Sequence, residues 1–145
     1  MKEYADPRMH SAEHILNQTM VRMFDCGRCF SSHIEKKKSK CDYRFDRNLT
    51  GQEITEIDCR VNQVIEQDLP IGEEFLKREE AESLFDMDRL PDGEDRQIRI
   101  VRIGNYDACP CIGEHVATTK EIGRFSITTT SYEDGVLRVR FKLTP

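Results

Sequence analysis

Two stretches of the chain carry apolar residues at the three-to-four-residue spacing of an amphipathic helix. Asp6 and Pro7 precede the first stretch, and both suit a helix start, Asp as the cap and Pro in the first turn. Its apolar stripe consists of Ala12, Leu16, Thr19, Met20 and Met23. Gly27 in "DCGRC" is a suitable terminator. We therefore expect a helix that begins near residue 6 and ends by "DCGRC".

The second stretch has the clearer helical pattern. "TGQE", from Thr50 to Glu53, is a capping box, and Pro70 enforces an end. Between them lies an apolar stripe of Ile54, Ile57, Val61, Val64 and Ile65. This stripe predicts a helix with one face in the core.

Most of the remaining chain alternates between apolar and polar residues, as strands do. "CFSSHIE" and "CDYRFD" predict a hairpin with the tip "KKKSK". "IGEEFLKREEA" predicts a strand that leads into a short acidic helix, "EEAESLF", and "RQIRIVRIG" predicts another strand. "GRFSITTTSYEDGVLRVRFKL" predicts two strands joined by a turn at Asp134-Gly135. "LPDGED" and "DACPCIGEHV" contain Pro and Gly and predict loops.

The order of these elements favours an α+β fold with a mostly antiparallel sheet and two main helices packed on one face. The length of 145 residues suits one domain, spanning residues 1–145. No apolar run approaches the ~18 residues of a membrane span, and the N-terminus has no apolar signal region. We therefore expect a cytoplasmic protein that does not bind membranes; the sequence does not indicate an oligomeric state.

The charge balance argues against a protein that binds nucleic acid through its bulk charge. The net charge is −5 and the pI about 5.4, whereas such proteins are usually basic. We expect no DNA binding. A local basic patch in "EKKKSK" can still grip one end of an RNA, although short basic runs are more often solvated turns. Its cations are Lys36, Lys37, Lys38 and Lys40.

Two pairs of potential metal ligands share a four-residue spacing. His10 and His14 lie one helical turn apart, so both imidazoles can face one ion. Cys111 and His115 repeat the spacing about a hundred residues later, in "CIGEH". One thiolate with imidazoles is an ordinary zinc ligand set. The two pairs together predict a Zn²⁺ site.

Two other metal sites are alternatives. "HSAEH" also fits the H-x-x-E-H motif of inverted zinc proteases, with Glu94 as a third ligand. Glu13, however, is expected to point about 100° away from both histidines and to be solvated or held in a salt bridge. A zinc ribbon would use "CGRC" with Cys109 and Cys111, but C-x-C is tight for a ligand pair. Without a signal peptide, the six cysteines are expected to be reduced.

"HSAEHIL", together with "CIGEHVATTKEIGRF" and the tract "YRFDRNLTGQEITEIDCRVNQVIEQDLPI", resembles the editing domain shared by alanyl- and threonyl-tRNA synthetases. The resemblance is greatest to short free-standing alanyl-type editing proteins, and it spans about residues 10–125. It implies that His10, His14, Cys111 and His115 hold zinc. It also implies hydrolysis of the ester between a wrong amino acid and tRNA, with seryl or glycyl groups on tRNA(Ala) as substrates and the acceptor end as the bound part.

Further site residues follow from this reaction. His10, His14 and His33 are the candidate catalytic residues, with His33 in a predicted strand beside the site. The candidate substrate-binding residues are Ser31, Ser32, Ile112, Gly113 and Thr118, and the basic patch would contact tRNA. Family members often carry "CGGTH", whereas this chain has "CIGEH", which changes the pocket loop. An inactive, zinc-stabilised tRNA-binding or regulatory module is therefore the alternative to an enzyme.

Overall fold

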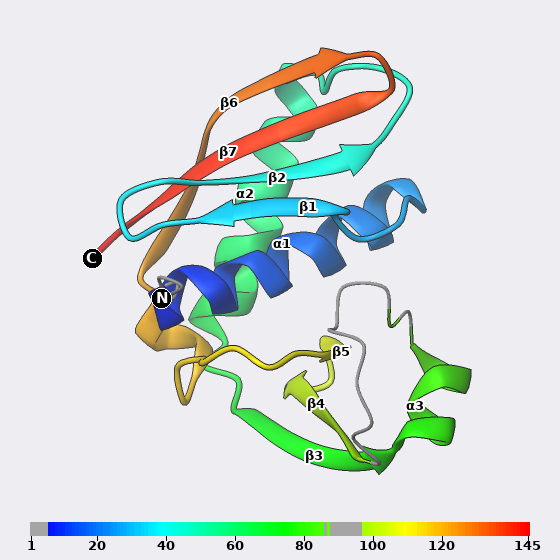
Figure 1. The fold of residues 1–145 in the computed structure, drawn as a ribbon. Helices are drawn as coiled ribbons and strands as arrows, with labels where there is room; N and C mark the ends of the chain where they lie inside the picture. Colours follow the sequence, from blue (N-terminus) through cyan, green and yellow to red (C-terminus); the bar gives the residue numbers. More distant parts are fainter. Residues whose placement is uncertain (1–5, 86, 88–96) are drawn as a thin grey trace.

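The computed structural model describes residues 6–85, 87 and 97–145. Its helices and strands form three layers, in which two helices lie between two antiparallel sheets (Figure 1). The helices of the middle layer are α1 (Pro7–Phe24) and α2 (Gly51–Glu66). The predicted α+β class with antiparallel pairing is confirmed, but the strands form two sheets rather than the one expected.

The larger sheet has the strand order β1-β2-β7-β6. Its strands are β1 (Ser31–Ile34), β2 (Ser39–Arg44), β6 (Arg124–Glu133) and β7 (Val136–Thr144). One face packs on α1 and α2 and contributes to the main core with them, including Tyr43, Phe125 and Phe141. The predicted hairpins at 31–44 and 124–144 are both present, with Asp134 and Gly135 at positive φ in the second turn.

The smaller sheet has the order β3-β4-β5 and lies on the other side of α1 (Figure 1). It consists of β3 (Ile71–Lys77), β4 (Gln97–Ile103) and β5 (Asp107–Pro110), with the short helix α3 (Arg78–Leu84) packed on it. Its own small core is formed by Ala81, Ile98 and Ile100, apart from the main core. The expected loop at "LPDGED" lies outside the described residues.

The helix ends follow the sequence signals closely. The side chain of Asp6 accepts a hydrogen bond from the N–H of Arg8, and Thr50 and Glu53 form the predicted capping box. The first helix ends at Phe24, where Asp25 takes the left-handed conformation, so Gly27 is not its terminator. The second helix ends at Glu66, four residues before Pro70.

One predicted loop is partly wrong. "DACP" is the edge strand β5, which pairs with β4 from Asp107↔Ile103 to Pro110↔Ile100. Proline is tolerated there because an edge strand has one unpaired side and this residue closes the strand. A 3₁₀ turn, η1 (Thr119–Ile122), then connects this region to β6. Among the described residues, no helix is long and apolar enough to cross a membrane.

Candidate metal centre

Helix α1 supplies the first half of a histidine and cysteine cluster. His10 and His14 are one turn apart, near the beginning of the helix that Asp6 caps. Ala12 and Leu16 on the same helix are fully buried, which fixes its orientation against the core. His14 is buried and His10 half-buried. Both imidazoles face the segment that follows β5, which carries Cys111 and His115.

The second half comes from the residues after β5, and Arg99 of β4 holds them in place. The N–H of Cys111 donates to the carbonyl of Arg99 at 3.2 Å. The Arg99 guanidinium in turn donates to the carbonyls of Cys111, at 3.0 Å, and Gly113, at 2.8 Å. These bonds fix the backbone from which Cys111 and His115 project.

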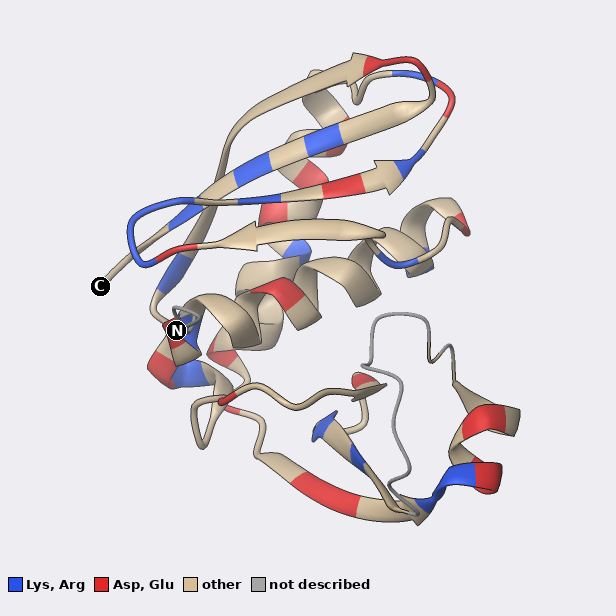
Figure 2. Ribbon diagram, viewed as in Figure 1, with Lys and Arg blue, Asp and Glu red and all other residues tan. Residues whose placement is uncertain are grey.

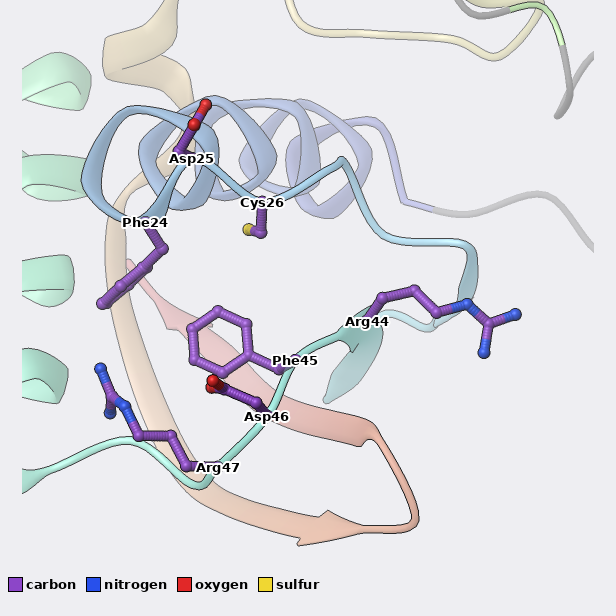
Figure 3. Close-up of a pocket in the computed structure, with 7 residues that line it drawn as sticks. All are labelled: Phe24, Asp25, Cys26, Arg44, Phe45, Asp46 and Arg47. Carbon is purple, nitrogen blue, oxygen red and sulfur yellow. The ribbon is translucent and has the colours of Figure 1, made fainter.

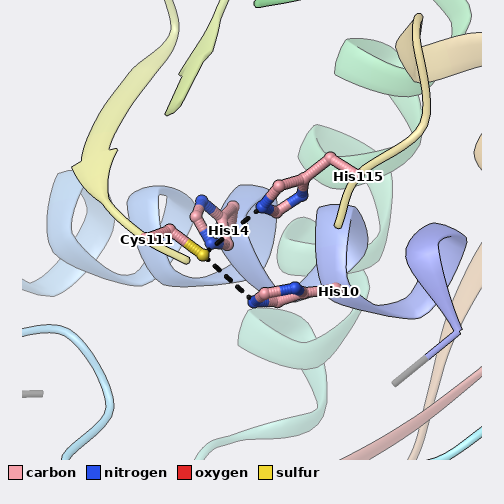
Figure 4. Close-up of side chains that lie close together, drawn as sticks. All are labelled: His10, His14, Cys111 and His115. Carbon is pink, nitrogen blue, oxygen red and sulfur yellow. Dashed lines mark hydrogen bonds between the residues drawn. The ribbon is translucent and has the colours of Figure 1, made fainter. Parts of the chain in front are cut away.

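The four side chains converge, with one ligand atom of each lying within 4.8 Å of the others (Figure 4). The Cys111 sulfur lies 3.5 Å from Nε2 of His10 and 3.5 Å from Nε2 of His115. A tetrahedral zinc ion with bonds of ~2.3 Å to sulfur and ~2.0 Å to nitrogen would hold such atoms ~3.5 Å apart. The residues therefore fit a zinc ion.

The protonation of two of the four residues, Cys111 and His115, also suits a metal. Burial alone would raise the pKa of Cys111, but hydrogen bonds from the three imidazoles lower it to about 3. Burial lowers the pKa of His115 to about 4. At neutral pH the cluster thus offers a thiolate and a neutral imidazole, the forms that bind metal. Burial instead raises the pKa of the neighbouring Cys109 to about 12, so that thiol keeps its proton.

Two side chains lie beside the outer nitrogens of His115 and His14, Ser11 within hydrogen-bond distance and Asp107 at ion-pair distance, and sequence reasoning missed both. The hydroxyl of Ser11 lies 3.0 Å from Nδ1 of His115 and also accepts the N–H of Val116. Oδ2 of Asp107 lies 3.7 Å from the buried Nδ1 of His14. Such outer partners orient metal-binding imidazoles. The sequence feature that could have indicated Asp107 is its position four residues before the candidate ligand Cys111.

Asp107 is itself held firmly. It accepts hydrogen bonds from Arg28, at 2.7 Å, and from the amide of Gln18, at 2.9 Å. Burial would raise its pKa, but His14 and Arg28 hold the pKa of this carboxyl well below its usual range. The pKa of His14 rises to about 9, because Asp107 and Cys111 outweigh burial, which lowers it. Asp107 is therefore an anion fixed beside the ligand ring.

The prediction that the side chain of Glu13 points away from both histidines is wrong. Its side chain is only 5% exposed, and Oε1 lies 3.6 Å from Nε2 of His10. The thiol of Cys29 donates to Oε2 at 3.4 Å, and Cys41 lies in the same buried group. On the Glu13 side, α1 faces the larger sheet. The side chain of Glu13 is therefore buried in the interior and not solvated.

The other predicted site residues are spread over several surfaces. His33 lies on β1, is exposed and hydrogen-bonds with Glu35, so the structure does not bring it to the cluster. Ile112 is 74% exposed beside Cys111. Thr118 caps η1 through Glu121. Ser31 and Ser32 are half-buried on opposite faces of β1, with Ser32 opposite the buried Cys41.

Gly113, a candidate substrate-binding residue, lies against the ring of His10, and only a glycine leaves room for that contact. A Cβ built on this residue would lie 2.1 Å from Cε1 of His10. Its N–H donates to the Cys111 sulfur at 3.3 Å. The glycine thus lets the loop close over the ligand ring. Glu94, the third ligand of the protease interpretation, lies outside the described residues.

A hollow of about 500 Å³ lies at the other end of α1 (Figure 3). Arg44, Asp46 and Arg47 line its polar side, and the rings of Phe24 and Phe45, which meet edge to face, line its apolar side. None of its lining residues belongs to the His/Cys cluster. The metal centre is therefore a separate feature of the molecule.

Comparisons with known proteins agree with the resemblance. A family model described as the threonyl and alanyl tRNA synthetase second additional domain matches residues 98–140, which include Cys111 and His115. The alanine–tRNA ligase of Methanothrix thermoacetophila is 33% identical over 97% of this chain, and that of Methanopyrus kandleri 30% identical over 92%. The chain spans only about one sixth of these ligases, 16% and 15% of their lengths. By its sequence, this chain is a relative of the alanine–tRNA ligases, and its residues 98–140 match the second additional domain of threonyl- and alanyl-tRNA synthetases.

Proposed function

We propose that this protein is a zinc-dependent hydrolase that removes a wrong amino acid, serine or glycine, from tRNA(Ala). The observation that carries the proposal is the convergence of His10, His14, Cys111 and His115 in a relative of the alanine–tRNA ligases. The reaction is hydrolysis of an ester, which needs a water molecule and stabilisation of the negative charge on the carbonyl oxygen. A bound zinc ion supplies a Lewis acid for this chemistry.

The protein's own residues would position the ester. The N–H of Gly113 is engaged by the Cys111 sulfur, so we assign stabilisation of the oxyanion to the N–H groups of the neighbouring Ile112 and Glu114. Among the hydroxyl candidates, Thr118 caps η1, whereas Ser32 faces inward beside Cys41. We therefore assign recognition of the substrate hydroxyl to Ser32. A site that bonds a hydroxyl strongly rejects the amino acid that lacks it.

The second candidate function is a zinc-stabilised tRNA-binding module without catalysis. Four protein ligands are typical of structural zinc sites, whereas catalytic zinc usually keeps one position open. The four-ligand cluster favours this alternative, because it offers water no vacant position unless the coordination expands or a ligand leaves. Only an activity measurement separates the two functions.

The test is deacylation of seryl-, glycyl- and alanyl-tRNA(Ala) by the zinc-loaded protein, with and without a chelator. We expect seryl- or glycyl-tRNA to be hydrolysed, alanyl-tRNA to be spared, and chelation to stop the reaction. Cys111→Ser should abolish activity, and the matched Cys109→Ser variant should retain it. Activity that survives complete removal of zinc would refute the metal's role. Absence of any deacylation would favour the binding module, and cleavage of unfolded peptides the protease.

A further inference from the structure

The larger sheet has an outer face that no helix or strand of the described residues covers. Inward side chains such as Leu137, Val139 and Phe141 are buried, whereas the intervening residues of β7 point outward. The register with β7 places Lys40 and Arg44 of β2 on the same outer face, opposite Arg140 and Val136. Figure 1 shows α1 and α2 on the opposite face of this sheet.

This outer face is basic although the chain as a whole is acidic. Its cations are Lys40, Arg44, Arg124, Arg138, Arg140 and Lys142, and the tip of the β1–β2 hairpin adds Lys36, Lys37 and Lys38. Against these nine stand three carboxylates, Glu35, Asp42 and Glu133, while the net charge of the chain is −5. Figure 2 shows the positive charge gathered on β7, β2 and the hairpin.

The strand register places like charges opposite each other. Lys40 of β2 is the direct partner of Arg140 of β7, an arrangement that destabilises a sheet. Asp42 relieves part of this repulsion, because it binds Arg138 at 2.8 Å and Lys40 at 3.3 Å. A like-charge pair that costs stability, on a face with several further cations, is explained most simply by an anionic partner.

The side chains around the cations suit phosphate oxygens. Thr129 lies opposite Arg140 and Ser126 opposite Lys142, so hydroxyl and cationic groups alternate across the face. Arg, Lys, Ser and Thr are the side chains that contact the phosphate backbone of nucleic acids. Along β7 three cations recur at every second residue, ~6.7 Å apart, in an extended line.

We propose that this outer face, from the hairpin tip to Lys142, binds the phosphate backbone of the tRNA. The inference rests on the proposed function, because that function brings tRNA to this protein. The helix layer separates the face from the smaller sheet beside the metal centre (Figure 1). The face therefore adds affinity for the body of the RNA and takes no part in the chemistry.

The test compares two double variants that remove the same charge. Arg140→Gln with Lys142→Gln removes two cations of the outer face, and Arg60→Gln with Lys77→Gln removes two exposed cations on α2 and β3. Binding of a fluorescent, deacylated tRNA(Ala) transcript is measured from 50 to 200 mM salt. The first pair should lower the slope of log affinity against log salt by about two and weaken binding about tenfold at 0.1 M salt. The second pair of substitutions should leave both the slope and the affinity unchanged.

Equal effects of the two pairs, or no effect of the first, would overturn the proposal. So would binding of phosphatidylserine vesicles that depends on Arg140 and Lys142 when tRNA binding does not. Because the transcript carries no ester, the measurement is independent of hydrolysis. If the first variant still deacylates tRNA and binds it as tightly as the wild type, the proposal for this face is refuted and the hydrolase proposal stands. Tight binding through the face without any deacylation would refute the hydrolase and leave this inference standing.

Discussion

At the scale of single residues, the metal centre depends on the partners of its ligands. Asp107 is fixed by Arg28 and Gln18 and lies 3.7 Å from Nδ1 of His14. Asp107→Asn keeps the shape but removes the charge that orients the ring. We expect zinc affinity to fall by about 10- to 100-fold. Competition with a chromophoric chelator measures this, and Asp134→Asn, in an exposed turn, is the control. Unchanged affinity would mean that Asp107 does not position His14.

Gly113 allows a second prediction. A methyl group on this residue would collide with the His10 ring, with atoms 2.1 and 2.4 Å apart, so Gly113→Ala must displace the ring or the loop. We expect weaker cobalt binding and a changed visible spectrum in the cobalt-loaded protein. Gly27→Ala is the matched control, because a Cβ there meets nothing within 4 Å. A wild-type spectrum for Gly113→Ala would show that the loop does not close on His10.

These residues show how far sequence reasoning reaches. The repeated four-residue spacing was enough to group His10 and His14 with Cys111 and His115, which the fold does bring within 4.8 Å. Asp107 also lies four residues before Cys111, but that spacing does not show that its carboxylate faces His14. The roles of Ser11 and Asp107 arise only when distant segments meet. His33 was placed near the site from its strand alone, but the face on which it points depends on register.

At the scale of elements, the start of α2 makes stability depend on pH. A hydrogen bond from Arg47 lowers the pKa of Glu53 from 4.5 to about 2. The stabilisation is therefore complete above pH ~4.5 and is lost as the pH falls through about 2. Glu53→Gln should lower the urea midpoint at pH 6, with a difference from wild type that shrinks toward pH 2. Thr50→Ala, which removes a hydroxyl cap worth about 1 kcal/mol, should act at both pH values.

The same comparison of urea midpoints can contradict this account. A Glu53→Gln effect of equal size at pH 6 and near pH 2 would show that the carboxylate charge is not the source.

The helix itself was predictable because its caps and stripe are local signals. The strand β5 was not, since Pro110 and the short span of Asp107–Pro110 conceal a pairing that only β4 supplies.

At the scale of the whole molecule, two sheets enclose the helices. The sequence predicted the pairing within two hairpins, but not the division of the strands into two sheets. The smaller sheet has its own core of Ala81, Ile98 and Ile100. The main core holds α1, α2 and the larger sheet together, and from the smaller sheet only the end of β4, at Ile103, is buried in it. The metal centre spans this division, because His10 and His14 come from α1, whereas Cys111 and His115 follow β5.

A bound zinc ion should therefore tie the smaller sheet to α1. Removal of zinc should speed amide hydrogen exchange in β5 and in residues 111–116, while β2 and β7 remain protected. Zinc at 1,000 times its dissociation constant stabilises the native state by about 4 kcal/mol, so the melting temperature should fall on chelation. Cys111→Ser should show the faster exchange already and respond little to chelator. Faster exchange spread equally over both sheets would mean that zinc supports the main core, and no change anywhere would mean that the two layers hold together without it.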